Sequence, residues 1–172
     1  ERFGIRYSLA LDGISLLMVL LTGLLQLVGV LLAWQVQRQT GLFFALLLVM
    51  ESGLMGIFLA HDLVLFYLFW EIALVPMFFL IAFWGQERGH QAALKFFLYT
   101  LAGSLCMLLS IIGLYLLHGE QTGHYSFLIR DLRQTELTTA QELWLFGGFL
   151  AAFAIKSPIL PFHTCLPDAL TE

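Results

Sequence analysis

The stretch LVLFYLFWEIALVPMFFLIAFW, residues 63–84, is the part of the sequence that decides the fold. A helix needs about 20 predominantly apolar residues to cross a bilayer. This stretch supplies them with one charged interruption, Glu71. Pro76 follows five residues later and frees the carbonyl of Ile72, which predicts a kink just beyond the carboxylate. We therefore expect a membrane-spanning helix that carries a buried acid next to a helix irregularity.

The composition agrees with a membrane protein. Of 172 residues, 60% are hydrophobic and 12% are charged, whereas soluble domains carry about 25% charged residues. A water-soluble fold of this size cannot bury so much apolar surface in one core. The composition excludes a soluble enzyme, a nucleic-acid-binding domain and a disordered chain. It predicts an all-α, polytopic bundle of transmembrane helices.

Five apolar stretches are long enough to span a membrane. They cover residues 11–34, 41–60, 63–84, 92–117 and 143–162. The polar loop 118–141 is the one sizeable extramembrane segment, and Pro158 and Pro161 predict that the last span is a broken helix. Because the sequence starts without Met and ends without a terminal signal, we expect residues 1–172 to form a single transmembrane segment of a longer chain.

Two of the charges inside the spans are predicted to form a proton relay. A central charge costs about 2.5–3.5 kcal/mol on insertion scales. Glu71 lies about 12 Å below the boundary, too deep for its side chain to reach the interface. Lys156 lies two residues before Pro158, where the carbonyl end of a half-helix suits a cation. The alternatives are a hydrogen-bonded acid that locks two helices together, and a structural ion pair or an interfacial lysine.

Three further residues are predicted as secondary relay sites. Lys95 lies one turn inside its span, where reaching the interface explains it equally well. Glu51 lies close to Gly53, so a structural role between closely packed helices carries equal weight. His163 titrates near neutrality, with Asp168 as its companion or as a helix N-cap. The aromatic residues 66–70 are expected to pack against lipid.

The sequence shows no pattern for a metal or a redox group on this chain. Cys106 and Cys165 are far apart and lack metal-ligand spacing, so neither a metal site nor a disulfide is predicted. Nothing resembles a nucleotide-binding loop, a haem ligand pair or an iron–sulfur cysteine run.

Three segments resemble the antiporter-like membrane subunits of complex I. Residues 63–77 are similar to the glutamate-bearing helix of that family, residues 95–100 to its next helix, and residues 153–164 to its broken-helix lysine segment. Order and spacing agree across nearly the whole chain. The best fit is the M-type, or chain 4, group of NAD(P)H-quinone oxidoreductase subunits, which also occurs in the plastoquinone-linked photosynthetic complex.

The resemblance implies the first part of an inverted-repeat, antiporter-like fold, with Glu71 and Lys156 as the relay pair of the first repeat. It implies a proton-translocating subunit of an NADH:quinone oxidoreductase with no redox centre on this chain. NAD(P)H, FMN, iron–sulfur clusters and quinone would be used by other subunits. Cys165 and Leu170 stand where the family usually has Trp and His, which leaves the relay beyond Lys156 open.

The resemblance also implies the surroundings of the chain. The partners would be other membrane-arm subunits of complex I, including other antiporter-like subunits, together with membrane lipids and no nucleic acid. The location would be a bacterial inner membrane, a thylakoid membrane or an organellar inner membrane. One alternative is a subunit of a multisubunit cation/proton antiporter, which shares the same motifs; another is a non-conducting scaffold.

Overall fold

The computed structural model describes residues 4–86, 88–157 and 159. Within these residues the chain is helical and contains no strand, apart from two isolated β-bridges. The elements are α1 (Gly13–Leu32), the 3-10 helix η1 (Ala33–Gln35), α2 (Thr40–Leu59), α3 (Leu63–Trp84), α4 (Gly89–Thr122), α5 (Ile129–Leu132) and α6 (Thr139–Lys156). By length and composition, four helices are able to cross a membrane: α1 with η1, α2, α3 and α4. The predicted all-α transmembrane bundle is confirmed.

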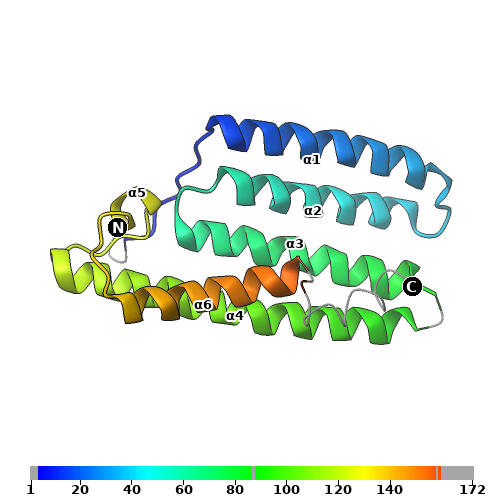
Figure 1. The fold of residues 1–172 in the computed structure, drawn as a ribbon. Helices are drawn as coiled ribbons and strands as arrows, with labels where there is room; N and C mark the ends of the chain where they lie inside the picture. Colours follow the sequence, from blue (N-terminus) through cyan, green and yellow to red (C-terminus); the bar gives the residue numbers. More distant parts are fainter. Residues whose placement is uncertain (1–3, 87, 158, 160–172) are drawn as a thin grey trace.

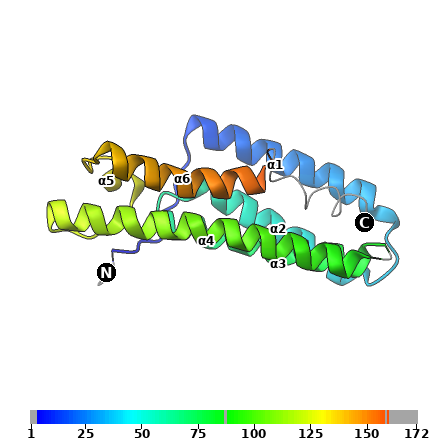
Figure 2. The same cartoon turned by 60° about the horizontal axis from the view of Figure 1, so that its bottom comes forward.

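The long helices lie side by side in the order of the chain (Figure 1). α1 lies at one edge of the bundle against α2, α2 packs on α3, and α3 packs on α4. α6 returns along α4 and ends about halfway along it, which both views show (Figures 1 and 2). A helix end is thereby placed in the middle of the bundle.

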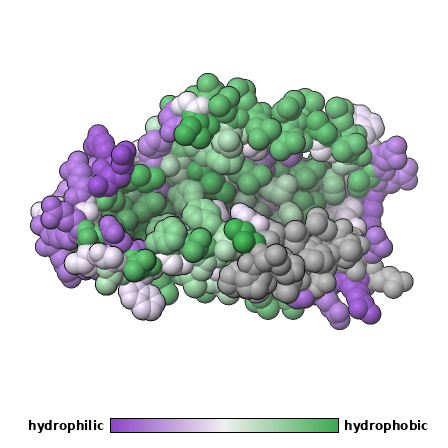
Figure 3. Space-filling model, in the orientation of Figure 1, coloured by the Kyte–Doolittle hydropathy of each residue, from purple (hydrophilic) through white to green (hydrophobic). Residues whose placement is uncertain are grey.

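The surface divides into an apolar band and two polar ends (Figure 3). Large apolar side chains are exposed along the band, including Leu32 at 78% and Trp144 at 84%. Soluble proteins rarely expose apolar area on this scale. The band is therefore the surface that faces lipid or neighbouring membrane helices.

Glycine brings α2 close to α3. A Cβ atom on Gly53 would lie 3.0 Å from the Cβ of Ala73, and one on Gly56 would overlap the ring of Phe69. Small residues permit such close helix approach inside membranes. The close packing expected near Glu51 is thus observed at Gly53 and Gly56, which follow it on α2.

Two boundaries differ from those expected for the loop 118–141. α4 continues to Thr122, because Gly123 adopts a left-handed conformation (φ 70°) and caps the helix, donating its N–H to the Gly119 carbonyl. α6 already begins at Thr139, because Thr138 and Gln141 form a capping box at its start. The loop between them also contains the short helix α5.

α3 runs through Pro76 without interruption, and the kink expected there stays a prediction. α3 is one continuous helix from Leu63 to Trp84 with Pro76 inside it. Proline removes a single backbone donor. In membranes, groups on neighbouring helices can satisfy the backbone carbonyl that is freed, so a helix can continue through proline. Pro76 is fully buried, so packing supports the helix there. The other predicted breaks, Pro158 and Pro161, lie outside the described residues.

Candidate functional site

Glu71 lies in the interior of α3, eight residues after the helix begins at Leu63. Its Oε1 atom is buried, and no described residue donates a hydrogen bond to it. Leaving a buried acceptor unsatisfied costs about 1–3 kcal/mol, and more when the group is charged. An acid whose role was to lock two helices together would have its oxygens paired. The orphan oxygen therefore favours the relay interpretation.

Lys156 is the last residue of α6 and is partly buried. It interacts electrostatically with Glu71, but among the described residues no direct ion pair joins the two. Its Nζ atom lies over the indole of Trp70, 5.1 Å from the ring centroid. The ammonium group thus has two neighbours on consecutive residues of α3.

The position of Lys156 follows from how α6 packs. Gly103 of α4 faces Ile155, and a Cβ atom on Gly103 would lie 2.8 Å from the Cδ1 of Ile155. α6 ends immediately afterwards, where Ser157 donates its N–H to the Phe153 carbonyl at 2.8 Å. Because α6 stops halfway along α4 (Figure 2), its carbonyl end and its lysine lie level with the interior of the bundle. Helix carbonyl ends carry partial negative charge, which favours the ammonium.

The sequence patterns did not point to Tyr67, which contacts Glu71, or to Ser104, which contacts Tyr67. Ser104 and Thr100 are buried on α4, and each donates to a carbonyl of its own helix. Tyr67 interacts with both Glu71 and Ser104. The available signal was the spacing, since Tyr67 precedes Glu71 by four residues and therefore shares its helix face.

Trp70 corrects the expectation that the aromatic residues 66–70 pack against lipid. It is only 6% exposed, whereas Leu68 is 50% exposed. Trp70 shares a helix face with Ala73 and Leu74, which are also buried. This face of α3 points at other helices, so the tryptophan belongs to the site.

The other predicted residues lie elsewhere on the helices or outside the described residues. Glu51 is partly buried on α2, and Lys95 is exposed near the start of α4. Their secondary relay roles stay predictions. His163 lies outside the described residues. Within the part of the chain that the structure describes, no group of three or more His, Cys, Asp or Glu side chains could hold a metal ion.

A hydrogen-bonded cap covers one end of the bundle, around Asp62 at the start of α3. Asp62 is fully buried. Its Oδ1 accepts hydrogen bonds from the N–H groups of Val64 (2.9 Å) and Leu65 (3.2 Å), and its Oδ2 accepts one from Arg6 (3.1 Å). The backbone next to Asp62 is also bonded to the loop between α4 and α6, because Leu63 donates its N–H to the Phe127 carbonyl.

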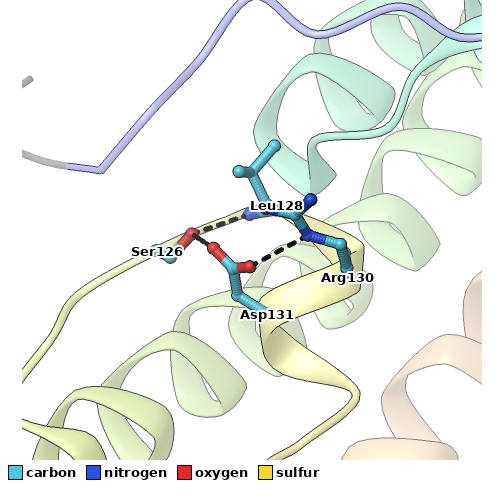
Figure 4. Close-up of polar contacts among 4 residues, drawn as sticks. All are labelled: Ser126, Leu128, Arg130 and Asp131. Carbon is cyan, nitrogen blue, oxygen red and sulfur yellow. Dashed lines mark hydrogen bonds and ion pairs between the residues drawn. The ribbon is translucent and has the colours of Figure 1, made fainter.

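The loop that joins this cap is itself held by polar contacts (Figure 4). The Ser126 hydroxyl donates to Asp131 at 2.8 Å and accepts from the Leu128 N–H at 3.2 Å. Arg130 forms an ion pair with Asp131 at 3.5 Å. The hydrogen bond from Ser126, and to a lesser extent the charge of Arg130, lower the pKa of the Asp131 carboxyl below its ordinary value.

Comparison with known proteins connects this arrangement to membrane complexes. A family model described as NADH:quinone oxidoreductase/Mrp antiporter, TM, matches residues 60–172. The NADH-quinone oxidoreductase subunit M of Escherichia coli (strain K12) is 45% identical over 177 residues, which cover 99% of this chain and 35% of that protein. The NAD(P)H-quinone oxidoreductase chain 4 2 of Thermosynechococcus vestitus is 42% identical, covering 99% and 31%. The chain thus spans about a third of the length of these relatives.

Solved structures give the same relationship. Respiratory complex I from Thermus thermophilus with bound NADH contains a chain with a TM-score of 0.86 and 38% identity, covering 97% of this chain and 34% of that one. The Mrp complex from Dietzia sp. contains a chain with a TM-score of 0.66 and 27% identity, covering 76% and 14%.

Proposed function

The chain belongs to the NADH:quinone oxidoreductase/Mrp antiporter transmembrane family, and from this premise we propose that it is part of a proton-translocating membrane subunit of an NAD(P)H-quinone oxidoreductase. The resemblance drawn from residues 63–77, 95–100 and 153–164 is confirmed by the family match and by relatives named subunit M and chain 4. The family is transmembrane, and bacterial and cyanobacterial relatives indicate a bacterial inner membrane or a thylakoid membrane.

Two features carry the proposal: Glu71 has a buried oxygen without a hydrogen-bond partner among the described residues, and Lys156, which interacts with it electrostatically, ends a helix in the middle of the bundle. A proton on Glu71 removes its negative charge and weakens the attraction on the Lys156 ammonium. Loss of that proton restores the attraction. Each change of charge on one residue therefore alters how readily the other holds its proton, which is the coupling that a relay needs.

The redox chemistry is assigned to other subunits in this proposal. The curated relatives are subunits of NADH-quinone oxidoreductases, and this chain would supply the proton path only. NAD(P)H, FMN, iron–sulfur clusters and quinone would then be bound elsewhere in the complex. The exposed apolar band is suited to contact with neighbouring membrane-arm subunits and with lipid.

The test is proton pumping by the whole complex in sealed vesicles, driven by electron transfer. Glu71→Gln and Lys156→Ala should each suppress pumping by about tenfold or more, because each removes one charge of the pair. Glu142→Gln and Arg133→Ala are matched controls, since both residues are exposed outside the site, and they should pump normally. A normal ratio of protons to electrons in both site variants would overturn the proposal.

A second candidate, a subunit of a multisubunit cation/proton antiporter, is favoured by the likeness to the Mrp complex. Identity to that chain is 27%, against 45% to subunit M, so we rank it second. Purification of the assembled complex separates the two functions. An iron–sulfur arm that co-purifies supports the oxidoreductase, and its absence together with sodium-dependent proton exchange in vesicles supports the antiporter.

A further inference from the structure

The indole ring of Trp70 contacts the ammonium group of Lys156, and the proposed relay does not account for this contact. The Lys156 ammonium lies 5.1 Å from the centroid of its ring, and Glu71 follows it directly in α3. A cation over an aromatic face is attracted by the electrons of the ring, most strongly when the ring is tryptophan. Lys156, at the end of α6, therefore has two partners on α3: the carboxyl group of Glu71 and the uncharged ring of Trp70.

The ring is held in place from two sides. Trp70 is 6% exposed and packs in a core cluster with Met107 and Ile111 of α4. Phe153 of α6 meets it edge to face, with centroids 5.4 Å apart and planes at 83°. Phe153 precedes Lys156 by three residues, about one helical turn. The helix that carries the lysine is thus docked directly on the ring that receives the ammonium.

We propose that Trp70 is a positioning residue that holds the Lys156 ammonium while Glu71 is protonated, and that Lys156 turns towards Glu71 when the carboxylate is charged. Among the described residues, Glu71 is the charged group that acts on Lys156. Without the ring, an ammonium facing a neutral Glu71 loses its buried partner. The state with a protonated Glu71 and the state with a charged Glu71 would then no longer be close in energy. This inference rests on the proposed function. It adds Trp70 as the residue that holds Lys156 away from Glu71 while Glu71 is protonated.

The test is a graded change in the ring at position 70 of the intact complex. Tryptophan carrying one, two or three fluorine atoms is incorporated at a stop codon, because each fluorine weakens the attraction for a cation while the shape of the ring is nearly kept. Pumping should fall stepwise along the series, by about fivefold in total if the attraction is lost. Trp70→Phe should be intermediate and Trp70→Leu lowest. Native gels report assembly of each variant.

The matched control is the same fluorinated series at Trp144, which is 84% exposed on α6 and should leave pumping unchanged. Equal pumping along the series at position 70 would overturn the inference, and so would an equal fall at position 144. The proposed function fails separately: Glu71→Gln and Lys156→Ala would then pump normally. If those variants fail to pump and the fluorinated series is flat, only the role of Trp70 is lost.

Discussion

Two carboxylates, Asp62 at the start of α3 and Glu71 inside it, have buried oxygens but opposite surroundings. Asp62 caps the helix and accepts hydrogen bonds from three backbone N–H groups. Glu71 lies nine positions later and has a buried oxygen with no hydrogen-bond partner among the described residues. The first carboxylate is fixed by its neighbours, and its hydrogen bonds are part of the architecture. The second keeps an unsatisfied oxygen, as the proposed relay role would allow.

Burial alone does not separate the structural carboxylate, Asp62, from the candidate relay acid, Glu71. Asp62 is the more deeply buried of the two, at 0% exposure. What separates them is hydrogen bonding: donors from the N-terminal segment and from α3 itself converge on Asp62, whereas Glu71 shares its surroundings with one cation, Lys156. The two sites should therefore respond differently to substitution.

The largest effect is expected for Asp62→Ala. This change removes the N-cap of α3 and leaves the Arg6 N–H without its acceptor, which should lower the free energy of unfolding by about 2–4 kcal/mol. Unfolding of the full-length protein in detergent measures it. Asp62→Asn keeps one acceptor oxygen and should lose less. Equal stability of the wild type and Asp62→Ala would contradict the structural role.

Gly103→Ala should have the next largest effect. The new Cβ atom would lie 2.8 Å from the Cδ1 of Ile155, so α6 or the Ile155 side chain must shift, at a cost of about 1–3 kcal/mol. Because Lys156 follows Ile155, pumping should fall as well. Gly147→Ala is the control, since its Cβ would meet nothing within 4 Å. A stable, fully active Gly103→Ala complex would show that the close approach is not needed.

Glu71→Gln should change stability by less than about 1 kcal/mol, although the proposed function predicts that it suppresses pumping. Glutamine has nearly the same shape as glutamate and keeps one acceptor oxygen at this position. The measurement is the same unfolding experiment, set beside the vesicle assay. A loss of stability as large as that of Asp62→Ala would mean that both carboxylates are structural, and the contrast between them would disappear.

The smallest effect concerns Asp131. Its pKa is lowered in the folded protein, so its contribution to stability is present above the unfolded pKa of about 3.9 and is lost as pH falls through the lower folded value. The ion-pair side chain is 27% exposed, so a few tenths of a kcal/mol are expected. Between pH 6 and pH 2 the wild type should lose that much more stability than Asp131→Asn. Parallel curves would exclude the contribution.

Much of the fold was predictable because membrane helices follow from length and apolarity. α3 matches its expected bounds, since Asp62 is a favoured N-cap and the apolar run ends at Gly85. The loop bounds were missed although two local signals mark them: Gly123 ends α4 and the Thr138/Gln141 capping box begins α6. The two hydrogen bonds that join Gln121 to Glu136 across the loop leave no such local pattern.

The candidate site was predictable only in part. Glu71 and Lys156 stand out because charges are rare in apolar segments. Trp70 and Tyr67 do not, because α3 is apolar on all sides, and a helix without a polar face gives no sign of which side meets other helices. Their role depends on where α6 ends, which the sequence signals only through the prolines after Lys156.

The length of α4 has a mechanical consequence. Its 34 residues make a rod of about 51 Å, while the hydrocarbon core of a bilayer is about 30 Å thick. Near its outer end His118 bonds to Thr135, and farther in Ser104 contacts Tyr67. An unbroken helix transmits a tilt from one end to the other. A tilt imposed on α4 at the surface loop would therefore reach Ser104, which contacts Tyr67, the residue one turn before Glu71.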